Sequence, residues 1–228
     1  MILKASNLTK RYGKKEVLKG LDFEIEKPGI YAVLGKNGAG KTTFFRLLTS
    51  IEKSDDGKIE ISGQTDLDRK IGYLPTDQYF YPRILGKEYL QFCLHARKMP
   101  VNDYEKYNDL FELPLKTEVR SYSSGMKKKL GIMGLLLQDN SIYLLDEPYN
   151  GLDIESVMLV GKIIEKLALQ GKTVILSSHI LSSITDITKN IFYLKNGVLT
   201  DYREKSISSL TEELLSGDKL SKLDSFFK

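Results

Sequence analysis

Gly35-Lys36-Asn37-Gly38-Ala39-Gly40-Lys41-Thr42 is the stretch that decides the fold of this chain. A continuously apolar run, residues 30–34, precedes it, and a helix-like pattern, residues 42–50, follows it. Strand, glycine-rich loop and helix in this order predict a phosphate-binding loop, because glycines let backbone N–H groups turn towards phosphates at a helix N-terminus. We expect the following residues to contact a nucleotide: Gly35, Asn37, Gly38, Gly40, Lys41, Thr42 and Thr43.

Two of these side chains have a chemical role that follows from their type. The ammonium group of Lys41 can reach the β- and γ-phosphate oxygens of ATP, and the hydroxyl of Thr42 can bind Mg²⁺. The competing interpretation is a glycine-rich turn that matches the pattern by chance. The strand before the loop and the helix after it favour the phosphate site.

Adjacent carboxylates end a second apolar run, Ile142-Tyr143-Leu144-Leu145-Asp146-Glu147. We expect Asp146 to bind Mg²⁺ and Glu147 to orient or deprotonate an attacking water. For this pair alone, a charged strand end that meets solvent is a serious alternative. His179 follows a third apolar run, residues 173–176, and should reach a γ-phosphate, because ligands collect at the carboxyl ends of parallel strands.

Composition sets broad limits on the function. The chain has 228 residues, enough for one domain, and 34 basic against 30 acidic residues, so no nucleic-acid partner is expected. Its single cysteine, Cys93, lies in an apolar run and is expected to be buried, which suits a reducing compartment. Since no apolar stretch approaches ~20 residues, we expect a soluble, cytoplasmic protein whose membrane part, if any, comes from a partner.

The pattern along the chain predicts an α/β fold with a mainly parallel sheet core and an N-terminal antiparallel β part. Residues 1–78 and 139–205 should form this core, and residues 79–138, which show helical patterns only, an inserted helical subdomain. Asn196-Gly197 predicts a hairpin turn. The tail, residues 206–228, has a possible capping box, Ser209 with Glu212, before Leu214 and Leu215.

Tyr122-Ser123-Ser124-Gly125-Met126 resembles the signature of the ATP-binding cassette (ABC) ATPases and lies 23 residues before Asp146. With the other motifs, the resemblance covers residues 12–197, so the chain is identified as a member of that family. The resemblance implies a P-loop NTPase fold of ABC type with a RecA-like core. It also implies a second ABC subunit, identical or different, that pairs head to tail so that Ser123 and Gly125 contact the ATP held by the other copy.

The resemblance also assigns roles by position. Tyr12 matches the aromatic residue that stacks on adenine, Glu147 the catalytic glutamate, Asp153 the aspartate of the loop that communicates across the dimer, and His179 the γ-phosphate histidine. Lys41, Thr42 and Asp146 match the phosphate and Mg²⁺ contacts, and Lys41 is counted with Glu147 and His179 as catalytic.

Two motifs depart from the usual family pattern. Ser124 and Met126 resemble the Tyr-Ser-x-Gly-Met variant found in many bacterial export-type systems. Tyr73-Leu74-Pro75 is followed by Thr76 where the family has glutamine, and Gln78, two residues on, is the candidate metal contact. Whether Thr76 or Gln78 takes that part stays open.

Two further segments allow a functional and a plain interpretation. Tyr79-Phe80-Tyr81-Pro82 either receives a helix of a membrane partner or packs the core of the helical subdomain, and we weigh the two equally. Lys127-Lys128-Lys129 is interpreted as a solvated helix face.

The resemblance implies an ATPase, with ATP and Mg²⁺ as cofactors, that drives transport, more specifically export, through a separate membrane-spanning permease subunit. Such a protein is peripheral on the inner face of the cell membrane. The alternative is a soluble non-transport ABC ATPase that acts on a macromolecular complex. A small-molecule kinase sharing only the phosphate loop is disfavoured by the signature, the Asp-Glu pair and His179.

Overall fold

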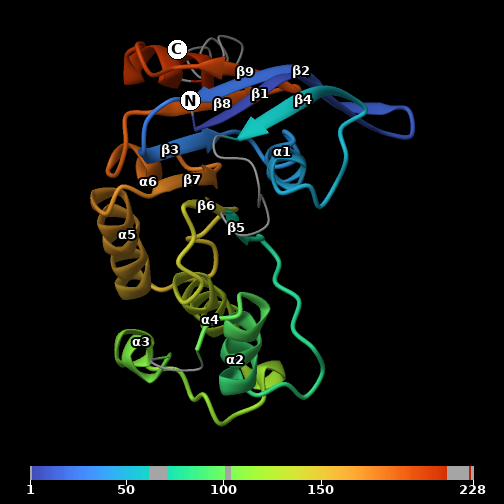
Figure 1. The fold of residues 1–228 in the computed structure, drawn as a ribbon. Coiled ribbons are helices and arrows are strands. Elements are labelled where there is room, and N and C mark those ends of the chain that lie inside the picture. Colours follow the sequence, from blue (N-terminus) through green and yellow to red (C-terminus); the bar gives the residue numbers. More distant parts are fainter. Residues whose placement is uncertain (1, 62–70, 101–103, 215–225, 227–228) are drawn as a thin grey trace.

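The structure is a computed structural model of the 228-residue chain and describes residues 2–61, 71–100, 104–214 and 226. Two sheets and a group of helices follow one another from top to bottom in Figure 1. All helices in the described part of the chain are too short or too polar to pass through a lipid bilayer.

A three-stranded antiparallel sheet lies at the N-terminal end, with the order β2-β1-β4. Its strands are β1 (Leu3–Tyr12), β2 (Lys15–Ile25) and β4 (Asp56–Ile61). Tyr12 is the last residue of β1, where it pairs with Lys15 of β2. The two-residue turn between them is possible because Gly13 adopts a left-handed conformation, with φ +59°.

The second sheet has six strands in the order β5-β6-β7-β3-β8-β9, and all its pairs are parallel except β8 with β9. These strands are β3 (Gly29–Leu34), β5 (Ile71–Leu74), β6 (Ile142–Leu145), β7 (Thr173–Ser178), β8 (Ile191–Lys195) and β9 (Val198–Asp201). The last four residues of β3 and all of β6 and β7 are buried, as their continuous apolar character predicts. The predicted mainly parallel core is therefore confirmed.

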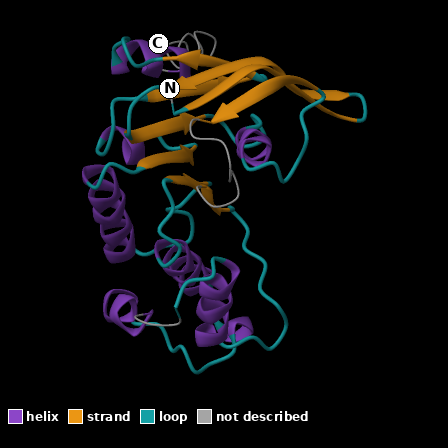
Figure 2. Cartoon of the chain, viewed as in Figure 1, coloured by secondary structure: helices purple, strands orange, loops and turns teal. Residues whose placement is uncertain are grey.

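Helix α1 (Lys41–Leu48) lies between the two sheets (Figure 2), where an aromatic group fills the space. Phe44 of α1 packs edge-to-face on Phe23 of β2, with ring centroids 5.2 Å apart, and Phe23 contacts Phe192 of β8 at 4.6 Å. Helices α5 (Ile154–Leu169) and α6 (Ser182–Thr185) belong to the second core, on the other side of the six-stranded sheet. The phosphate-loop helix is therefore held in place by side chains from both sheets.

Between β5 and β6 the described chain forms helices: α2 (Gly86–Ala96), α3 (Tyr104–Phe111), the 3₁₀ turn Val119–Ser121 and α4 (Ser124–Leu136). A single bridge joins Leu85 to Glu118. Cys93 of α2 is buried, as expected, since it faces α4 at Gly134. Tyr122 anchors the start of α4, because its hydroxyl donates to the carbonyl of Pro114 at 2.8 Å.

Residues 207–214 are helical and close the described part of the tail. The expected capping box at Ser209 is wrong by one turn: the Ser206 hydroxyl accepts from the N–H of Ser209 at 3.2 Å, so Ser206 caps this helix. Leu214 packs against the core, whereas Leu215 lies outside the described residues.

Candidate nucleotide site

The phosphate loop begins where β3 ends, and three of its glycines are required by their surroundings. A Cβ atom on Gly35 would lie 2.6 Å from the carbonyl oxygen of Leu194, which no side chain tolerates. Gly38 and Gly40 have φ values of +79° and +109°, in the region that favours glycine. The loop therefore has the tight backbone that a phosphate cradle needs, and α1 begins directly after it.

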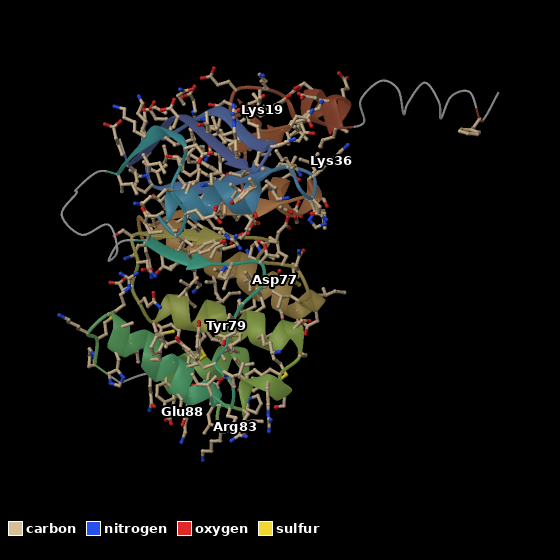
Figure 3. All side chains as sticks on the ribbon, turned by 90° about the vertical axis from the view of Figure 1, so that its right-hand side faces the viewer. Lys19, Lys36, Asp77, Tyr79, Arg83 and Glu88 are labelled. Carbon is tan, nitrogen blue, oxygen red and sulfur yellow. The ribbon has the colours of Figure 1, made fainter. Side chains whose placement is uncertain are left out.

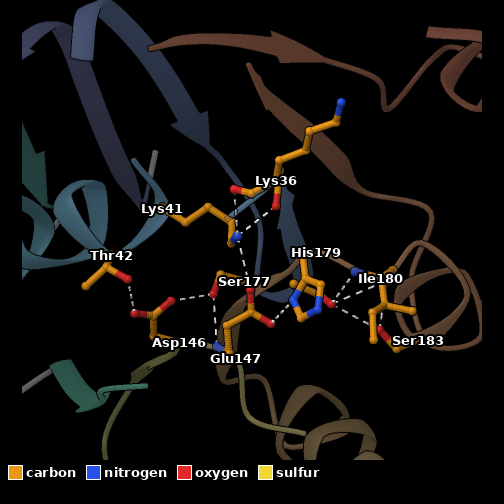
Figure 4. Close-up of polar contacts among 11 residues, drawn as sticks. Lys36, Lys41, Thr42, Asp146, Glu147, Ser177, His179, Ile180 and Ser183 are labelled. Atoms are coloured by element: carbon orange, nitrogen blue, oxygen red, sulfur yellow. Dashed lines mark hydrogen bonds and ion pairs between the residues drawn. The ribbon is translucent and has the colours of Figure 1, made fainter. Parts of the chain in front are cut away.

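Lys41 is buried and folds back over this loop (Figure 4). Its Nζ donates to the carbonyl oxygens of Gly35 at 2.7 Å and Lys36 at 3.3 Å. It also forms an ion pair with Oε1 of Glu147, at 3.0 Å. The cation predicted to bind phosphate is therefore already beside the predicted catalytic carboxylate.

Asp146 and Glu147 follow β6 and are both buried. Oδ2 of Asp146 accepts from the Thr42 hydroxyl at 2.6 Å, and Oδ1 accepts from the Ser177 hydroxyl at 2.5 Å. Oε2 of Glu147 lies 3.0 Å from Nδ1 of His179 (Figure 4). The structure thus brings together Lys41, Thr42, Asp146, Glu147 and His179, which come from three different regions of the sequence.

A cavity of about 520 Å³ opens beside these groups. Among its walls are residues of the loop and α1, the segment after β5, and the turn after β6: Asn37, Gly38, Gly40, Lys41, Thr42, Thr43, Arg46, Pro75, Thr76, Asp77, Glu147 and Asn150. Most residues predicted to contact the nucleotide therefore line one hollow. Gly35 does not line it and acts through its carbonyl group, which holds Lys41.

The ligand set suits Mg²⁺. Thr42 and Asp146 present a hydroxyl and a carboxylate oxygen 2.6 Å apart, and hard cations prefer oxygen ligands. The described residues contain no group of three His, Cys, Asp or Glu side chains placed to bind a metal unaided. This matches the way proteins hold Mg²⁺, through one or two side chains together with substrate phosphates.

Tyr12 does not line the cavity and is 45% exposed. Its hydroxyl donates to the carboxylate of Glu52, which also accepts from Arg46, a wall residue, at 3.1 Å. The Tyr12 hydrogen bond, followed by Arg46, lowers the pKa of Glu52, whereas burial and then Glu52 raise the pKa of Tyr12. The Tyr12 ring is thus linked through Glu52 to a residue of the cavity wall.

Gln78 is not part of this group in the structure. A Cβ atom on Gly131 of α4 would lie 2.5 Å from the Gln78 amide oxygen, so the amide packs against α4. Its nitrogen and oxygen are buried without a hydrogen-bond partner among the described residues. Thr76 and Asp77 line the cavity where the Gln78 contact was expected.

Lys128 corrects the interpretation of the lysine run as a solvated face, because it is only 4% exposed. Its Nζ donates to the carbonyl of Thr76 at 2.9 Å and to that of Pro75 at 3.4 Å, since this face of α4 packs against the segment after β5. Burial lowers the pKa of Lys128, and the nearby carboxylates of Asp146, Asp77 and Glu147 act in the opposite direction.

The signature residues lie apart from the cavity walls. Ser123 caps α4 by accepting from the N–H of Met126 at 3.1 Å, and neither it nor Gly125 lines the cavity. A Cβ atom on Gly125 would lie 2.8 Å from the carbonyl of Gly151, so the signature packs on the loop that ends at Asp153. Asp153 in turn caps α5 by accepting from the N–H of Ser156 at 2.8 Å. The side chain of Ser156, followed by this N–H, lowers the pKa of Asp153.

Ser177 is the site residue whose role the sequence reasoning missed. The register of β6 and β7 pairs Leu145 with Leu176, so the next residues, Asp146 and Ser177, are neighbours. Once the strand order is known, the sequence therefore predicts that the Ser177 hydroxyl lies beside Asp146. Lys128 had no comparable signal, because only tertiary packing distinguishes it from Lys127 and Lys129.

Comparison with known proteins agrees with this geometry. The family model described as "ABC transporter" matches residues 18–150. "Uncharacterized ABC transporter ATP-binding protein MJ1023" of Methanocaldococcus jannaschii is 34% identical over 88% of this chain and 76% of its own. "Lantibiotic transport ATP-binding protein SrtF" of Streptococcus pyogenes is 32% identical over 96% of this chain and 98% of its own. "Bacitracin transport ATP-binding protein BcrA" of Bacillus licheniformis is 32% identical over 88% of this chain and 69% of its own.

Two solved structures share the fold. "Structure of ATP binding subunit of ABC transporter" has a TM-score of 0.84 and 24% identity, over 95% of this chain and 100% of that chain. "Dimeric Structure of MJ0796, a Bacterial ABC Transporter Cassette" has a TM-score of 0.77 and 21% identity, over 87% of this chain and 96% of that chain. At these identities the likeness establishes the fold alone.

Proposed function

This chain belongs to the ABC transporter family, and from that premise we propose that it is the ATP-binding and ATP-hydrolysing subunit of an exporter. The observation that carries the proposal is the group formed by Lys41, Asp146, Glu147 and His179 beside a 520 Å³ cavity. A phosphate loop alone would serve many enzymes. A buried Asp-Glu pair next to its lysine serves hydrolysis, because the Glu is placed to act on water.

Each side chain has a distinct part in this proposal. Lys41 binds the terminal phosphates, and a phosphate group would compete with Glu147 for its ammonium. Thr42 and Asp146 hold Mg²⁺, which when bound neutralises charge on the phosphate oxygens. Glu147 orients the water and accepts its proton, and His179, which contacts Glu147, binds the γ-phosphate when ATP is present.

A second copy, or a similar subunit, is needed to complete the site. Ser123 and Gly125 sit at the N-terminus of a 13-residue helix and are suited to bind phosphate, yet they do not line this chain's cavity. We place them over the nucleotide of the opposing subunit. Ser123 is exposed, so it is free to do so.

An aromatic surface on α2 and the segment before it fits a membrane-spanning partner. Tyr79 and Tyr81 are 78% and 61% exposed, and Phe92 is 54% exposed, with neighbouring rings in edge-to-face contact. Figure 3 shows Tyr79 close to Asp77, at the end of the segment that lines the cavity. Phe80 packs on Tyr89 and against the core, as the core-packing interpretation predicts, so the proposed partner surface consists of the exposed rings alone.

Relatives named for transport of a lantibiotic, of bacitracin and of the SkfA peptide favour export, and a peptide or peptide-like compound as the cargo class. A photo-crosslinking amino acid at position 79 should form an adduct with a multi-span membrane protein in native membranes. The matched control is position 162, on the exposed face of α5. No adduct from 79, or equal adducts from both positions, would contradict this surface assignment.

The catalytic assignment is tested with Glu147→Gln. We expect trinitrophenyl-ATP to bind as tightly as it does to the wild type, while ATP turnover falls by about 100-fold or more, because the general base is lost. Glu165→Gln is the control, since Glu165 is an exposed residue paired with Lys162 on α5. Turnover within threefold of the wild type would refute the role of Glu147.

A further inference from the structure

Ser177 contacts both acidic residues of the site, Asp146 through its carboxylate and Glu147 through its backbone. It is the fifth residue of β7 and is fully buried. Its hydroxyl donates to Oδ1 of Asp146 at 2.5 Å and accepts from the backbone N–H of Glu147 at 2.9 Å (Figure 4). Its single proton is thus used on Asp146, and a lone pair is used on Glu147.

The backbone of Glu147 needs such support. Its φ is +49°, in the left-handed region that a residue with a side chain rarely adopts, and such conformations persist only where neighbours impose them. The preceding N–H, of Asp146, donates to the carbonyl of Leu74 on β5 at 2.8 Å. The turn after β6 is therefore tied to β5 on one side and, through Ser177, to β7 on the other.

Asp146 is oriented in the same way. Thr42, on the phosphate-loop helix, holds Oδ2 at 2.6 Å, and Ser177 holds Oδ1. Without the Ser177 hydroxyl, the Asp146 carboxylate would keep the hydrogen bond from Thr42 and lose the one from Ser177. It could then rotate away from the orientation in which it and Thr42 would bind Mg²⁺ together. The Glu147 N–H would be left buried without an acceptor, which is costly.

We propose that Ser177 is a positioning residue that sets Asp146 for Mg²⁺ and aims Glu147 at the attacking water. This inference rests on the proposed function, because it concerns the metal-dependent step of the same site. It assigns one hydroxyl on a neighbouring strand to the carboxylate of Asp146 and to the backbone of Glu147, so that the same atom supports the metal contact and the turn that carries the base.

The test measures Mg²⁺ dependence separately from nucleotide binding. Ser177→Ala is compared with Ser177→Thr, which keeps the hydroxyl, and with Thr173→Val, which removes a buried hydroxyl four residues earlier on the same face of β7. Trinitrophenyl-ATP binding is measured in EDTA and across a Mg²⁺ titration, together with kcat, KM and the midpoint of thermal unfolding.

For Ser177→Ala we expect unchanged affinity in EDTA, a Mg²⁺ midpoint raised about tenfold and a kcat lowered by about 10- to 100-fold, in the range of a lost hydrogen bond to a charged group and a misaligned base. Ser177→Thr should return both values to within threefold of the wild type. Thr173→Val should leave both unchanged.

A Ser177→Ala protein with the wild-type Mg²⁺ midpoint overturns the proposal, even if it melts earlier, because a structural role alone lowers stability only. Ser177→Cys, whose thiol fills the space but donates weakly, is made in parallel in case the alanine variant does not fold. A wild-type Mg²⁺ midpoint in the cysteine variant likewise overturns it. Failure of the wild type to bind trinitrophenyl-ATP would instead refute the proposed function.

Discussion

Glu52 illustrates how much of the site depends on residues outside its motifs. Its carboxylate accepts hydrogen bonds from the hydroxyl of Tyr12 and the guanidinium of Arg46. It therefore connects the ring of Tyr12 to Arg46, a residue of the cavity wall. Stacking of an aromatic ring on a base is worth about 1–3 kcal/mol, and only a correctly placed ring obtains it. We therefore expect Glu52 to contribute to nucleotide affinity without touching phosphate or metal.

Glu52→Gln should raise the Kd for trinitrophenyl-ATP by roughly three- to tenfold and change kcat by less than twofold, because the ring loses its charged anchor while the catalytic groups stay in place. Isothermal titration and steady-state kinetics measure the two effects. Glu60→Gln is the matched control, since Glu60 of β4 forms an ion pair with Lys58 and its side chain is 40% exposed. Equal affinities of the two variants would show that Tyr12 needs no anchor.

Glu52 also predicts a pH effect on stability. Its pKa in the folded chain lies below the ordinary 4.5, so its contribution is fully present above about pH 4.5 and is lost as the pH falls through the lowered value. We expect the wild type to exceed Glu52→Gln in the free energy of unfolding by roughly 0.2–1 kcal/mol at neutral pH. Urea titrations from pH 3 to 7 should show this difference in the free energy of unfolding shrinking in acid. A difference that grows in acid would mean that folding raises the pKa of Glu52.

At the scale of elements, Lys128 joins α4, which begins next to the signature, to the segment that lines the cavity after β5. It is a buried cation whose hydrogen bonds go to backbone carbonyls. Movement of α4 relative to the six-stranded sheet would therefore shift the backbone of Pro75 and Thr76. This gives the helical part a direct mechanical contact with the nucleotide cavity.

Lys128→Met should lower the free energy of unfolding by about 1–3 kcal/mol, because the Thr76 carbonyl would lose its donor within the interior. Lys127→Met, one residue earlier and less buried, should change it by less than 0.5 kcal/mol. Urea unfolding followed by circular dichroism measures both. A Lys128→Met protein as stable as the wild type would mean that burying the charge cancels the hydrogen bonds.

The elements show which patterns could be read from the sequence. The apolar runs that became β3, β6 and β7 predicted the parallel core. Strand β5 was missed because it has only four residues and contains Gly72. The side chain of Asn140 packs against this glycine so closely that a Cβ atom on Gly72 would lie 2.3 Å from the amide nitrogen. That glycine is explained by a contact 68 residues away, which local patterns cannot contain.

The site was predictable to the extent that its motifs are local. Lys41, Thr42, Asp146, Glu147 and His179 are brought together as the motif logic requires. Ser177 and Lys128 were not assigned their contacts because strand order and helix packing decide them. Gln78 shows the same dependence, since its amide packs on α4 in this structure.

At the scale of the whole molecule, the phosphate loop and the signature lie on different parts of one chain. The loop, α1 and the Asp-Glu turn surround the cavity, whereas Ser123 and Gly125 pack on the loop at Gly151. Within one molecule, the residues around the cavity and the signature residues therefore do not contact the same nucleotide. We therefore expect two molecules to pair with each cavity facing the other's signature.

The most direct test of this claim is the sedimentation mass of Glu147→Gln with saturating ATP. The account predicts a change from the 25.9 kDa monomer to a species of twice that mass. It also predicts that the double variant Glu147→Gln, Ser123→Arg stays monomeric while it still binds trinitrophenyl-ATP. A Glu147→Gln protein that remains at the monomer mass with ATP bound, or a double variant that dimerises equally well, would contradict it.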